Sequence, residues 1–370
     1  MTKALNVLLV AQTPPPHYGQ AVMMQHIATG HYRGVAIHHV RMAFSQDMRQ
    51  VGKFSVRKLF HLLGVIAKVA VARFRFNASV LYYPPSGPRK IPMYRDIAVL
   101  LATRWMFKKT IFHFEAGGLS ELYPALPRWV KPFFRAAYFG ADVGIRLDRF
   151  TPEDPITLHA RTEVIIPNAV DDAPSSVNPV HLHRPWVEPS ILYAGILRES
   201  KGVLVLLEAC ARLRAAGKRF GIRLMGEFES GGFEQRARTL AAQHELPIEW
   251  LGFRTGAEKD AAYSEADIFC FPSFFDSESG PVVLVEAMQF RLPIVSTLWR
   301  GIPGMVTDGY NGFLVPPHDA APVADRLARL IADQELARRM GAAGRAVYES
   351  RFTLRAFHQN LQEVFELVRD

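Results

Sequence analysis

The first half of the chain alternates short, continuous apolar runs with longer segments in which apolar and polar positions are mixed. Several of the apolar runs are rich in β-branched residues and have the length of buried strands. They predict strands at Asn6–Ala11, Val35–Val40, Ser79–Tyr83, Thr110–Phe114, Asp142–Leu147 and Glu163–Ile166. The longer segments predict helices at Gln20–Thr29, Arg57–Arg75, Ile91–Phe107 and Arg128–Phe139. Strands that alternate with helices favour a parallel sheet with helices on both faces.

The segment Asp171–Ser190 interrupts this alternation. Four prolines, together with Ser, Asn and Asp, make it typical of a connection between two domains. The alternation then resumes, with strands predicted at Ile191–Gly195, Ile222–Met225, Glu249–Gly252, Ile268–Phe271 and Ile294–Ser296. Helices are predicted at Lys201–Ala215, Gly232–His244, Ala257–Ala266 and Gly280–Phe290, and the tail Ala320–Asp370 is expected to be helical. The predicted fold class is α/β, with two Rossmann-like, doubly wound domains facing each other across a cleft.

Ligands of open α/β sheets bind beyond the carboxyl ends of the strands, so function is expected in the loops that follow strands. These loops are Thr13–Gly19, Glu115–Leu119, Gly195–Gly202, Gly226–Gly232 and Ser273–Pro281. Neither half contains the G-x-G-x-x-G fingerprint of a dinucleotide-binding fold, which argues against a dehydrogenase.

The length of 370 residues suits two domains of ordinary size. Two cysteines, Cys210 and Cys270, cannot form a disulfide framework, which favours a reducing compartment. The start of the chain lacks the features of a secretory signal, and no stretch reaches the roughly 20 apolar residues that a membrane-spanning helix needs. We therefore expect a cytoplasmic protein, either in solution or peripheral at the inner face of the membrane.

Positive charge is concentrated in the first half. Residues 1–175 contain 22 Lys and Arg against 11 Asp and Glu, and Met48–Arg95 contains ten basic residues and no acidic one. This asymmetry indicates an anionic partner. A basic amphipathic helix is typical of a membrane surface, although a core-packed helix with a solvated basic face has the same pattern. No nucleic-acid-binding motif accompanies the charge, so we expect an anionic membrane rather than nucleic acid.

Two carboxylates stand out in the segment from Phe271 to Met288. Glu278 lies in a loop after a buried strand, Gly280 and Pro281 open a helix, and Glu286 lies about two turns into that helix. Backbone N–H groups at a helix start bind phosphate or hydroxyl oxygens, and a carboxylate accepts hydrogen bonds from sugar hydroxyls. A structural explanation of Glu278 is also available, as an acidic residue that caps the N-terminus of the helix. Glu286 is harder to explain by packing, because unpaired carboxylates avoid burial.

A second segment of interest runs from Tyr193 through Gly195 to Gly202 and predicts a strand, a loop and a helix start. Arg198 and Lys201 can both face a diphosphate there, with the partial positive charge of the helix terminus beside them. A lysine at a helix start is more often simply solvated, so this segment carries little weight alone.

Together these segments resemble the retaining glycosyltransferase family 4, also described as glycosyl transferases group 1, which has the GT-B fold. The Glu-x7-Glu spacing from Glu278 to Glu286, ending in Glu-Ala-Met, is similar to its signature, and Gly195…Lys201-Gly202 is similar to its Gly-Arg-Leu-x-x-x-Lys-Gly motif. The other segments that resemble the family are Pro293-Ile-Val-Ser, Gly301-Ile-Pro, Asn311-Gly-Phe-Leu-Val, Ile166-Pro-Asn168 and Pro14-Pro-Pro-His-Tyr-Gly19.

The resemblance implies a role for each matching position. Glu278 would hold hydroxyls of the donor sugar, Glu286 the ribose of the nucleotide, and Lys201 the diphosphate. The candidate donor-binding residues are Gly19, Gly195, Arg198, Lys201, Ser279, Gly280, Pro281, Val282 and Glu286. No metal ion and no resident cofactor are expected, since the UDP- or GDP-sugar is a co-substrate. The leaving phosphate itself would take the acceptor proton, so its charge must be stabilised.

The resemblance also implies a division of labour between domains. Residues 1–172 would bind the acceptor and residues 173–351 the nucleotide sugar. The last helix, at about residues 352–370, would pack back on the first domain, as its single apolar face requires. Hinge bending through Asp171–Ser190 would close the domains on the donor.

The chain departs from the family pattern at two places. The Arg beside the first Gly is Ile196 here, and Arg198 is the residue that would replace its charge. The family often has His at the end of the strand Thr110–Phe114, and two alignments put either His113 or Glu115 in that place. A lone His on an apolar strand is more often packed in a core, so Glu115 is favoured as the third candidate catalytic residue beside Glu278 and His113.

The predicted function is therefore a retaining hexosyltransferase of cell-surface polysaccharide synthesis. Its partners would be a nucleotide-sugar donor, a glycan or lipid-linked glycan acceptor and an anionic membrane surface. A nucleotide-sugar epimerase of the same architecture and a non-catalytic donor-binding scaffold are the alternatives. The Glu-x7-Glu spacing favours the transferase over the first, and Glu278, Glu286 and Lys201 together argue against the second.

Overall fold

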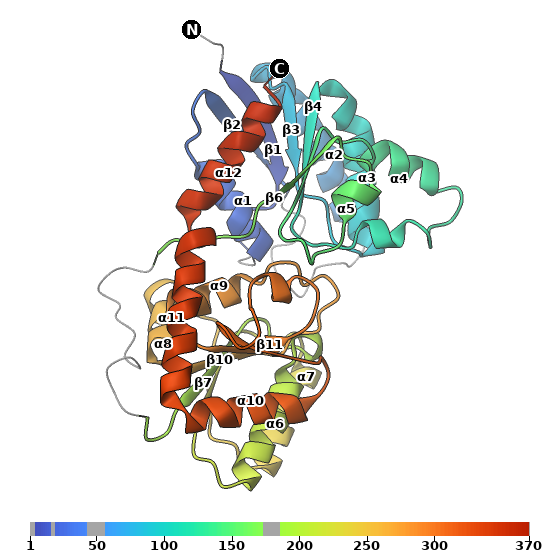
Figure 1. The fold of residues 1–370 in the computed structure, drawn as a ribbon. Coiled ribbons are helices and arrows are strands. Elements are labelled where there is room, and N and C mark those ends of the chain that lie inside the picture. The colour runs from blue at the N-terminus through green and yellow to red at the C-terminus, as the bar shows by residue number, and fades with distance from the viewer. Residues whose placement is uncertain (1–3, 16–18, 43–55, 173–185, 370) are drawn as a thin grey trace. The chain divides into compact units, whose positions relative to one another are not determined.

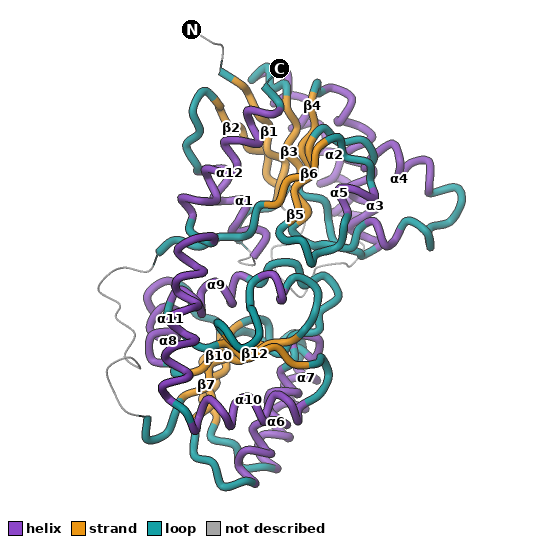
Figure 2. Tube along the Cα trace, in the orientation of Figure 1, coloured by secondary structure: helices purple, strands orange, loops and turns teal. Residues whose placement is uncertain are grey.

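The computed structural model describes residues 4–15, 19–42, 56–172 and 186–369 (Figures 1 and 2). The chain divides into two compact units, of which unit 1 comprises residues 1–168 and 354–370 and unit 2 comprises residues 169–353. Each unit contains one six-stranded sheet. All recorded strand pairs are parallel, so each unit is an α/β fold of the kind that alternating strands and helices predict.

In unit 1 the strand order is β2-β1-β3-β4-β5-β6. The strands are β1 (Leu5–Ala11), β2 (Val35–Arg41), β3 (Val80–Tyr83), β4 (Lys109–Phe114), β5 (Val143–Arg146) and β6 (Thr162–Ile165). The helices are α1 (Gly19–Thr29), α2 (Val56–Arg75), α3 (Lys90–Thr103), α4 (Lys131–Tyr138), α5 (Asp154–Thr157) and α12 (Leu354–Leu367). The sequence predicted all six strands, whereas the short helix α5 was not expected.

Side-chain alternation along β4 divides the residues between the two faces of the sheet. Phe112 and Phe114 are buried in a core with Phe134 and Tyr138 of α4. His113 points to the other face, where it contacts Tyr82 of β3. The fully buried His113 and the aromatic core therefore lie on opposite faces of the sheet.

The C-terminal helix α12 belongs to unit 1. Its apolar face is buried through Phe357, Leu361, Val364 and Phe365. The ring of Phe365 lies 4.9 Å from that of Tyr32, which precedes β2. Figure 1 shows this red helix beside β1, β2 and α1. The last seventeen residues thus complete a core that the first half of the chain builds.

In unit 2 the strand order is β12-β11-β10-β7-β8-β9. The strands are β7 (Ser190–Ala194), β8 (Gly221–Met225), β9 (Ile248–Gly252), β10 (Ile268–Phe271), β11 (Ile294–Thr297) and β12 (Gly312–Val315). The helices are α6 (Val203–Ala215), α7 (Gly231–Gln243), α8 (Gly256–Glu265), α9 (Val282–Gln289), α10 (Ala320–Ala332) and α11 (Gln334–Arg351). The sequence predicted five of these strands, and β12 is the additional one.

The predicted inter-domain connection and the unit boundary differ. Residues 173–185 of Asp171–Ser190 lie outside the described part of the chain. The boundary falls earlier, between Asn168 and Ala169, because Arg345 of α11 holds Asp172 to unit 2 through contacts of 2.9 and 3.0 Å. The second crossing lies between Thr353 and Leu354.

Within the described ranges, the helices are all too short or too polar to cross a bilayer.

Candidate functional site

The strand order of unit 2 brings two of the candidate loops together. Strand β7 pairs with β8 on one side and with β10 on the other, so the order reverses between β7 and β10. Such a reversal point is where ligands of open α/β sheets bind. The loop after β10 meets the loop after β7 directly, since the amide of Phe274 donates a hydrogen bond of 2.9 Å to the carbonyl oxygen of Ser200.

Glycines make the close approach of these loops possible. Gly202 has φ +80°, and a Cβ atom there would lie 2.0 Å from the carbonyl oxygen of Pro272. Gly226 has φ +147°, and its Cβ would lie 1.8 Å from the carbonyl oxygen of Gly195. Only glycine fits either position, because each backbone conformation and each contact excludes a side chain.

Glu278 lies at the meeting point of the two loops and is 5% exposed. Lys201, in the short 3-10 helix Glu199–Lys201, places its Nζ atom 2.6 Å from Oε2 of Glu278. The Ser273 hydroxyl donates a second hydrogen bond of 2.5 Å to the same oxygen. This ion pair is largely buried, and removing one partner of such a pair leaves an uncompensated charge.

Helix α9 begins at Val282, two residues later than predicted, after the extended residue Pro281. Ser279 is buried beside Glu278, and Gly280 is half-buried. The first turn of a helix carries N–H groups that have no partner within the helix and that attract anions. The loop from Glu278 to α9 therefore has the arrangement that suits a phosphate or hydroxyl oxygen.

Glu286 points out of α9 toward α8 rather than into an apolar core. Its carboxylate accepts hydrogen bonds from Nζ of Lys259 at 2.6 Å and from the hydroxyl of Tyr263 at 2.8 Å. Burial lowers the pKa of Lys259, but the ion pair and hydrogen bond with Glu286 outweigh it and hold this pKa above its ordinary value. Sequence reasoning missed both partners, although their i, i+4 spacing puts them on one face of α8.

Arg198 lies on the same side of unit 2 as Lys201. Its guanidinium contacts Glu229 at 3.0 Å and lies 5.0 Å from the ring centroid of Phe275. Ile196, which stands where the family has Arg, has its carbonyl oxygen bonded by the hydroxyl of Tyr193. A positive charge lies two residues further along the chain, on Arg198. Phe275 was not singled out from the sequence.

The sequence offered His113 and Glu115 as alternatives for one position at the end of β4. The structure places both side chains in one cluster in unit 1. His113 is fully buried, and its Nδ1 lies 2.7 Å from the hydroxyl of Tyr82. Its Nε2 lies 3.6 Å from Oε1 of Glu115, because residues two apart on a strand share a face. The separation exceeds that of a hydrogen bond, and neither of these buried atoms has a hydrogen-bond partner among the described residues.

Burial sets the protonation of this cluster. It lowers the pKa of His113 to about 3. It raises the pKa of Glu115 to about 8, against a hydrogen bond from Asn168 that lowers it. Both groups are therefore neutral near pH 7, and their contact is not an ion pair. Glu115 is the group of the two that titrates within the working range of an enzyme.

The remaining candidate, Gly19, is the first residue of α1 and is exposed. Residues 16–18 of the loop before it lie outside the described part of the chain. Among the described residues, no group of three His, Cys, Asp or Glu side chains has an arrangement that could hold a metal ion.

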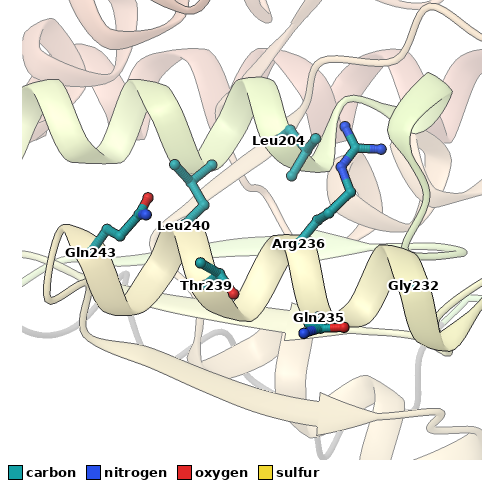
Figure 3. A pocket seen from close by; sticks show the side chains of 7 residues that line it. All are labelled: Leu204, Gly232, Gln235, Arg236, Thr239, Leu240 and Gln243. Carbon is teal, nitrogen blue, oxygen red and sulfur yellow. The ribbon is translucent and has the colours of Figure 1, made fainter.

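A groove of about 400 Å³ runs between α6 and α7 on unit 2 (Figure 3). Its lining residues are Leu204, Gly232, Gln235, Arg236, Thr239, Leu240 and Gln243. None of the sequence-predicted site residues is among them, so the groove is distinct from the β7–β10 loops.

Sequence comparison relates the second unit to a known family. Residues 183–347 match the model of the family described as glycosyl transferases group 1. The chain is 28% identical over 316 residues to the colanic acid biosynthesis glycosyltransferase WcaL of Escherichia coli, covering 84% of this chain and 74% of that protein. WcaL of Salmonella typhimurium is 44% identical over 138 residues, which are 36% of this chain and 33% of that protein.

A further relative is the amylovoran biosynthesis glycosyltransferase AmsK of Erwinia amylovora, which is 34% identical over 191 residues. That match covers 50% of this chain and 46% of AmsK. The chain thus spans about half or less of two of these relatives.

Solved structures share the fold over the whole chain. Sucrose-phosphate synthase of Thermosynechococcus elongatus superposes with a TM-score of 0.75 at 18% identity, covering 98% of this chain and 99% of that one. HepE of Anabaena in complex with UDP superposes with a TM-score of 0.73 at 18% identity, covering 98% and 100%. The chain has the GT-B fold, and its residues 183–347 are similar to the glycosyl transferases group 1 family.

Proposed function

We propose that this chain is a retaining glycosyltransferase that moves a hexose from a nucleoside-diphosphate sugar to a glycan or lipid-linked glycan acceptor in polysaccharide synthesis. Unit 2 binds the donor and unit 1 the acceptor. The observation that carries the proposal is the buried pair of Lys201 and Glu278 at the point where the strand order of unit 2 reverses. A cation for phosphate and a carboxylate for sugar hydroxyls meet there beside the start of α9.

The proposed chemistry depends on charge stabilisation of the leaving diphosphate. Lys201, Arg198 and the first turn of α9 supply positive charge without a metal ion. Glu278 accepts hydrogen bonds from the donor sugar, and Glu286 holds the ribose hydroxyls, as Lys259 and Tyr263 already orient its carboxylate. Because this charge comes from the protein, we expect donor turnover to be unchanged by EDTA.

The donor and acceptor classes are proposed from the relatives. WcaL and AmsK are named as enzymes of colanic acid and amylovoran biosynthesis, which favours a polysaccharide or its lipid-linked precursor. HepE has been solved with UDP-glucose, so UDP-glucose is the first donor to test. GDP-sugars are the second group.

Turnover with product analysis tests the proposal and separates it from its alternatives. Wild-type protein is incubated with each donor and membrane extract as the acceptor source, and NMR identifies the anomeric configuration of the product. We expect a new glycoside of retained configuration from wild type and none from Glu278→Ala. Conversion of the donor to its epimer without acceptor indicates an epimerase, and donor binding without turnover indicates a scaffold. Inverted configuration contradicts the retaining mechanism.

We also propose that unit 1 binds an anionic membrane surface through α2. One face of this helix presents large apolar side chains to solvent, with Phe60 and Phe74 exposed to 71% and 70% and Leu63 and Val71 between them. Their spacing puts them on the face opposite the buried residue Val65. Lys68 and Arg75 are exposed along one edge of this face. Apolar residues beside basic ones are typical of helices that lie in the lipid headgroup region.

Vesicle sedimentation measures this interaction. We expect binding to vesicles with anionic lipid and much weaker binding to neutral ones. Replacing Phe60 and Phe74 with Ser should weaken binding about tenfold or more, since each removes an apolar anchor. Trp129→Ser, which alters an exposed aromatic residue that follows the loop after β4, is the control. Equal binding to neutral and anionic vesicles contradicts the membrane proposal.

A further inference from the structure

The ring of Phe275 lies next to both cations of the candidate donor site. Nζ of Lys201 is 4.5 Å from the ring centroid, and the guanidinium carbon of Arg198 is 5.0 Å from it. Both distances lie within the range in which an aromatic ring attracts a cation. One side chain therefore contacts the two groups that are proposed to neutralise the diphosphate.

The backbone of Phe275 is anchored independently of the cations. The carbonyl oxygen of Phe275 accepts hydrogen bonds from Nε1 of Trp299 at 2.8 Å and from the amide of Glu278 at 3.0 Å. Its own amide donates to the hydroxyl of Ser273 at 3.3 Å. These contacts anchor the backbone of Phe275 in the loop after β10, so its ring projects from a fixed point toward the two long side chains.

The carboxylate partners of the cations compete with a phosphate, whereas the ring does not. Lys201 pairs with Glu278 and Arg198 pairs with Glu229. A diphosphate that binds both cations replaces these carboxylates. The two positive charges repel each other, and long side chains lose rotamer entropy when they are held in one geometry. Attraction to the face of an aromatic ring offsets part of this repulsion and part of this entropy loss. It also leaves the N–H groups of both cations available to a phosphate.

We infer that Phe275 is a positioning residue that holds Arg198 and Lys201 together as one diphosphate clamp. In this arrangement Arg198 supplies the charge that Ile196 does not, from a different point of the loop after β7. The inference rests on the proposed function, because it concerns the phosphate part of the same donor site. It predicts that the ring contributes to binding of the diphosphate and not of the nucleoside.

Binding titrations of the full chain separate these two contributions. The ligands are UDP and uridine, or GDP and guanosine if wild type binds the guanine nucleotide, with affinities measured by NMR. The variants are Phe275→Leu, which removes the ring, and Phe275→Tyr, which keeps it. The matched control is Phe274→Leu, the neighbouring half-buried residue, whose ring lies against His318 instead.

We expect Phe275→Leu to bind the nucleoside diphosphate about tenfold more weakly than wild type, since two ring contacts are lost. Nucleoside affinity should change less than about twofold. Phe275→Tyr and Phe274→Leu should match wild type for both ligands. Retained nucleoside binding also shows that Phe275→Leu is folded.

The inference is overturned if Phe275→Leu keeps wild-type affinity for the nucleoside diphosphate, or if Phe275→Tyr loses as much affinity as Phe275→Leu. It is also overturned if nucleoside and diphosphate affinities fall by the same factor, because that indicates a general change in the loop. Should wild type bind none of these nucleotides, the proposed function itself fails, which is a different result from any of these.

Discussion

Lys201 and Glu278 neutralise each other across the loops after β7 and β10, at a distance of 2.6 Å. The two groups are proposed to contact different parts of the donor. The ammonium of Lys201 binds the diphosphate, and the carboxylate of Glu278 binds the sugar. Donor binding therefore exchanges one ion pair for two sets of ligand contacts. Sequence motifs identified both residues, but they could not show that the two are bonded to each other.

The first prediction concerns this exchange. Glu278→Gln removes the carboxylate charge that competes with the diphosphate and leaves Lys201 without its buried counter-charge. We expect the affinity for UDP or GDP alone to rise about three- to tenfold, while sugar transfer is lost. Calorimetric titration measures the affinity. Glu234→Gln, which breaks a surface ion pair with Arg238, is the control. Weaker nucleotide binding by Glu278→Gln would show that the pair does not compete with the phosphate.

A second prediction concerns Glu115, whose pKa burial raises to about 8. The folded chain binds this proton between the unfolded pKa of about 4.5 and the folded value, so Glu115 lowers stability progressively as pH rises through that window. Glu115→Gln removes the effect. Relative to wild type, the variant should gain more than about 1 kcal/mol in unfolding free energy between pH 5 and pH 8.

Urea unfolding at the two pH values measures that gain. The control is Glu153→Gln, which alters a carboxylate whose side chain is 63% exposed. A stability difference between Glu115→Gln and wild type that is the same at both pH values contradicts the raised pKa.

At the scale of elements, continuous apolar runs predicted most of the strands. A strand that is buried on both faces of a sheet consists mainly of apolar residues. Strand β12 was not predicted because it begins at Gly312, and glycine is depleted in strands. Helix α5 was missed for a similar reason, as its four residues include Pro155. The residues that contact the candidate site residues were missed for a different reason. Phe275 and Lys259 act through contacts between elements, which local patterns do not encode.

The loop between β7 and α6 carries the third prediction. Gly202→Ala forces a side chain into a left-handed backbone position and against the carbonyl of Pro272. We expect a loss of about 1–3 kcal/mol in unfolding free energy and a large loss of donor affinity, because Lys201 directly precedes Gly202. Gly231→Ala, where a Cβ meets nothing within 4 Å, should be tolerated. Unchanged donor binding in Gly202→Ala would show that the loop geometry is not needed.

At the scale of the whole molecule, each unit has its own sheet and core, but the chain returns to unit 1 for its last helix. The single apolar face of the tail predicted that α12 would need a partner surface. The boundary itself was harder to predict, because the ion pair of Arg345 with Asp172 joins residues far apart in sequence. Stability of unit 1 thus depends on both ends of the chain.

A fourth prediction follows from this return. Phe365→Ala empties a fully buried site in α12 and should destabilise unit 1 by about 3–5 kcal/mol. Hydrogen exchange should show lost protection in β1–β6, while β7–β12 keep theirs. Glu363→Ala, on the exposed face of the same helix, should change neither sheet. Equal loss of protection in both units would contradict independent cores.

The loops after β7 and β10 form the proposed binding site for a nucleoside-diphosphate sugar. Thermal unfolding against a panel of UDP-, GDP- and ADP-sugars tests it most directly. A donor present at about 100 times its dissociation constant should stabilise the chain by roughly 2.7 kcal/mol. We expect a shift in unfolding temperature with one nucleotide class, and we expect Glu286→Ala to abolish it. No shift with any member of the panel, or a shift that Glu286→Ala retains in full, contradicts the proposed site.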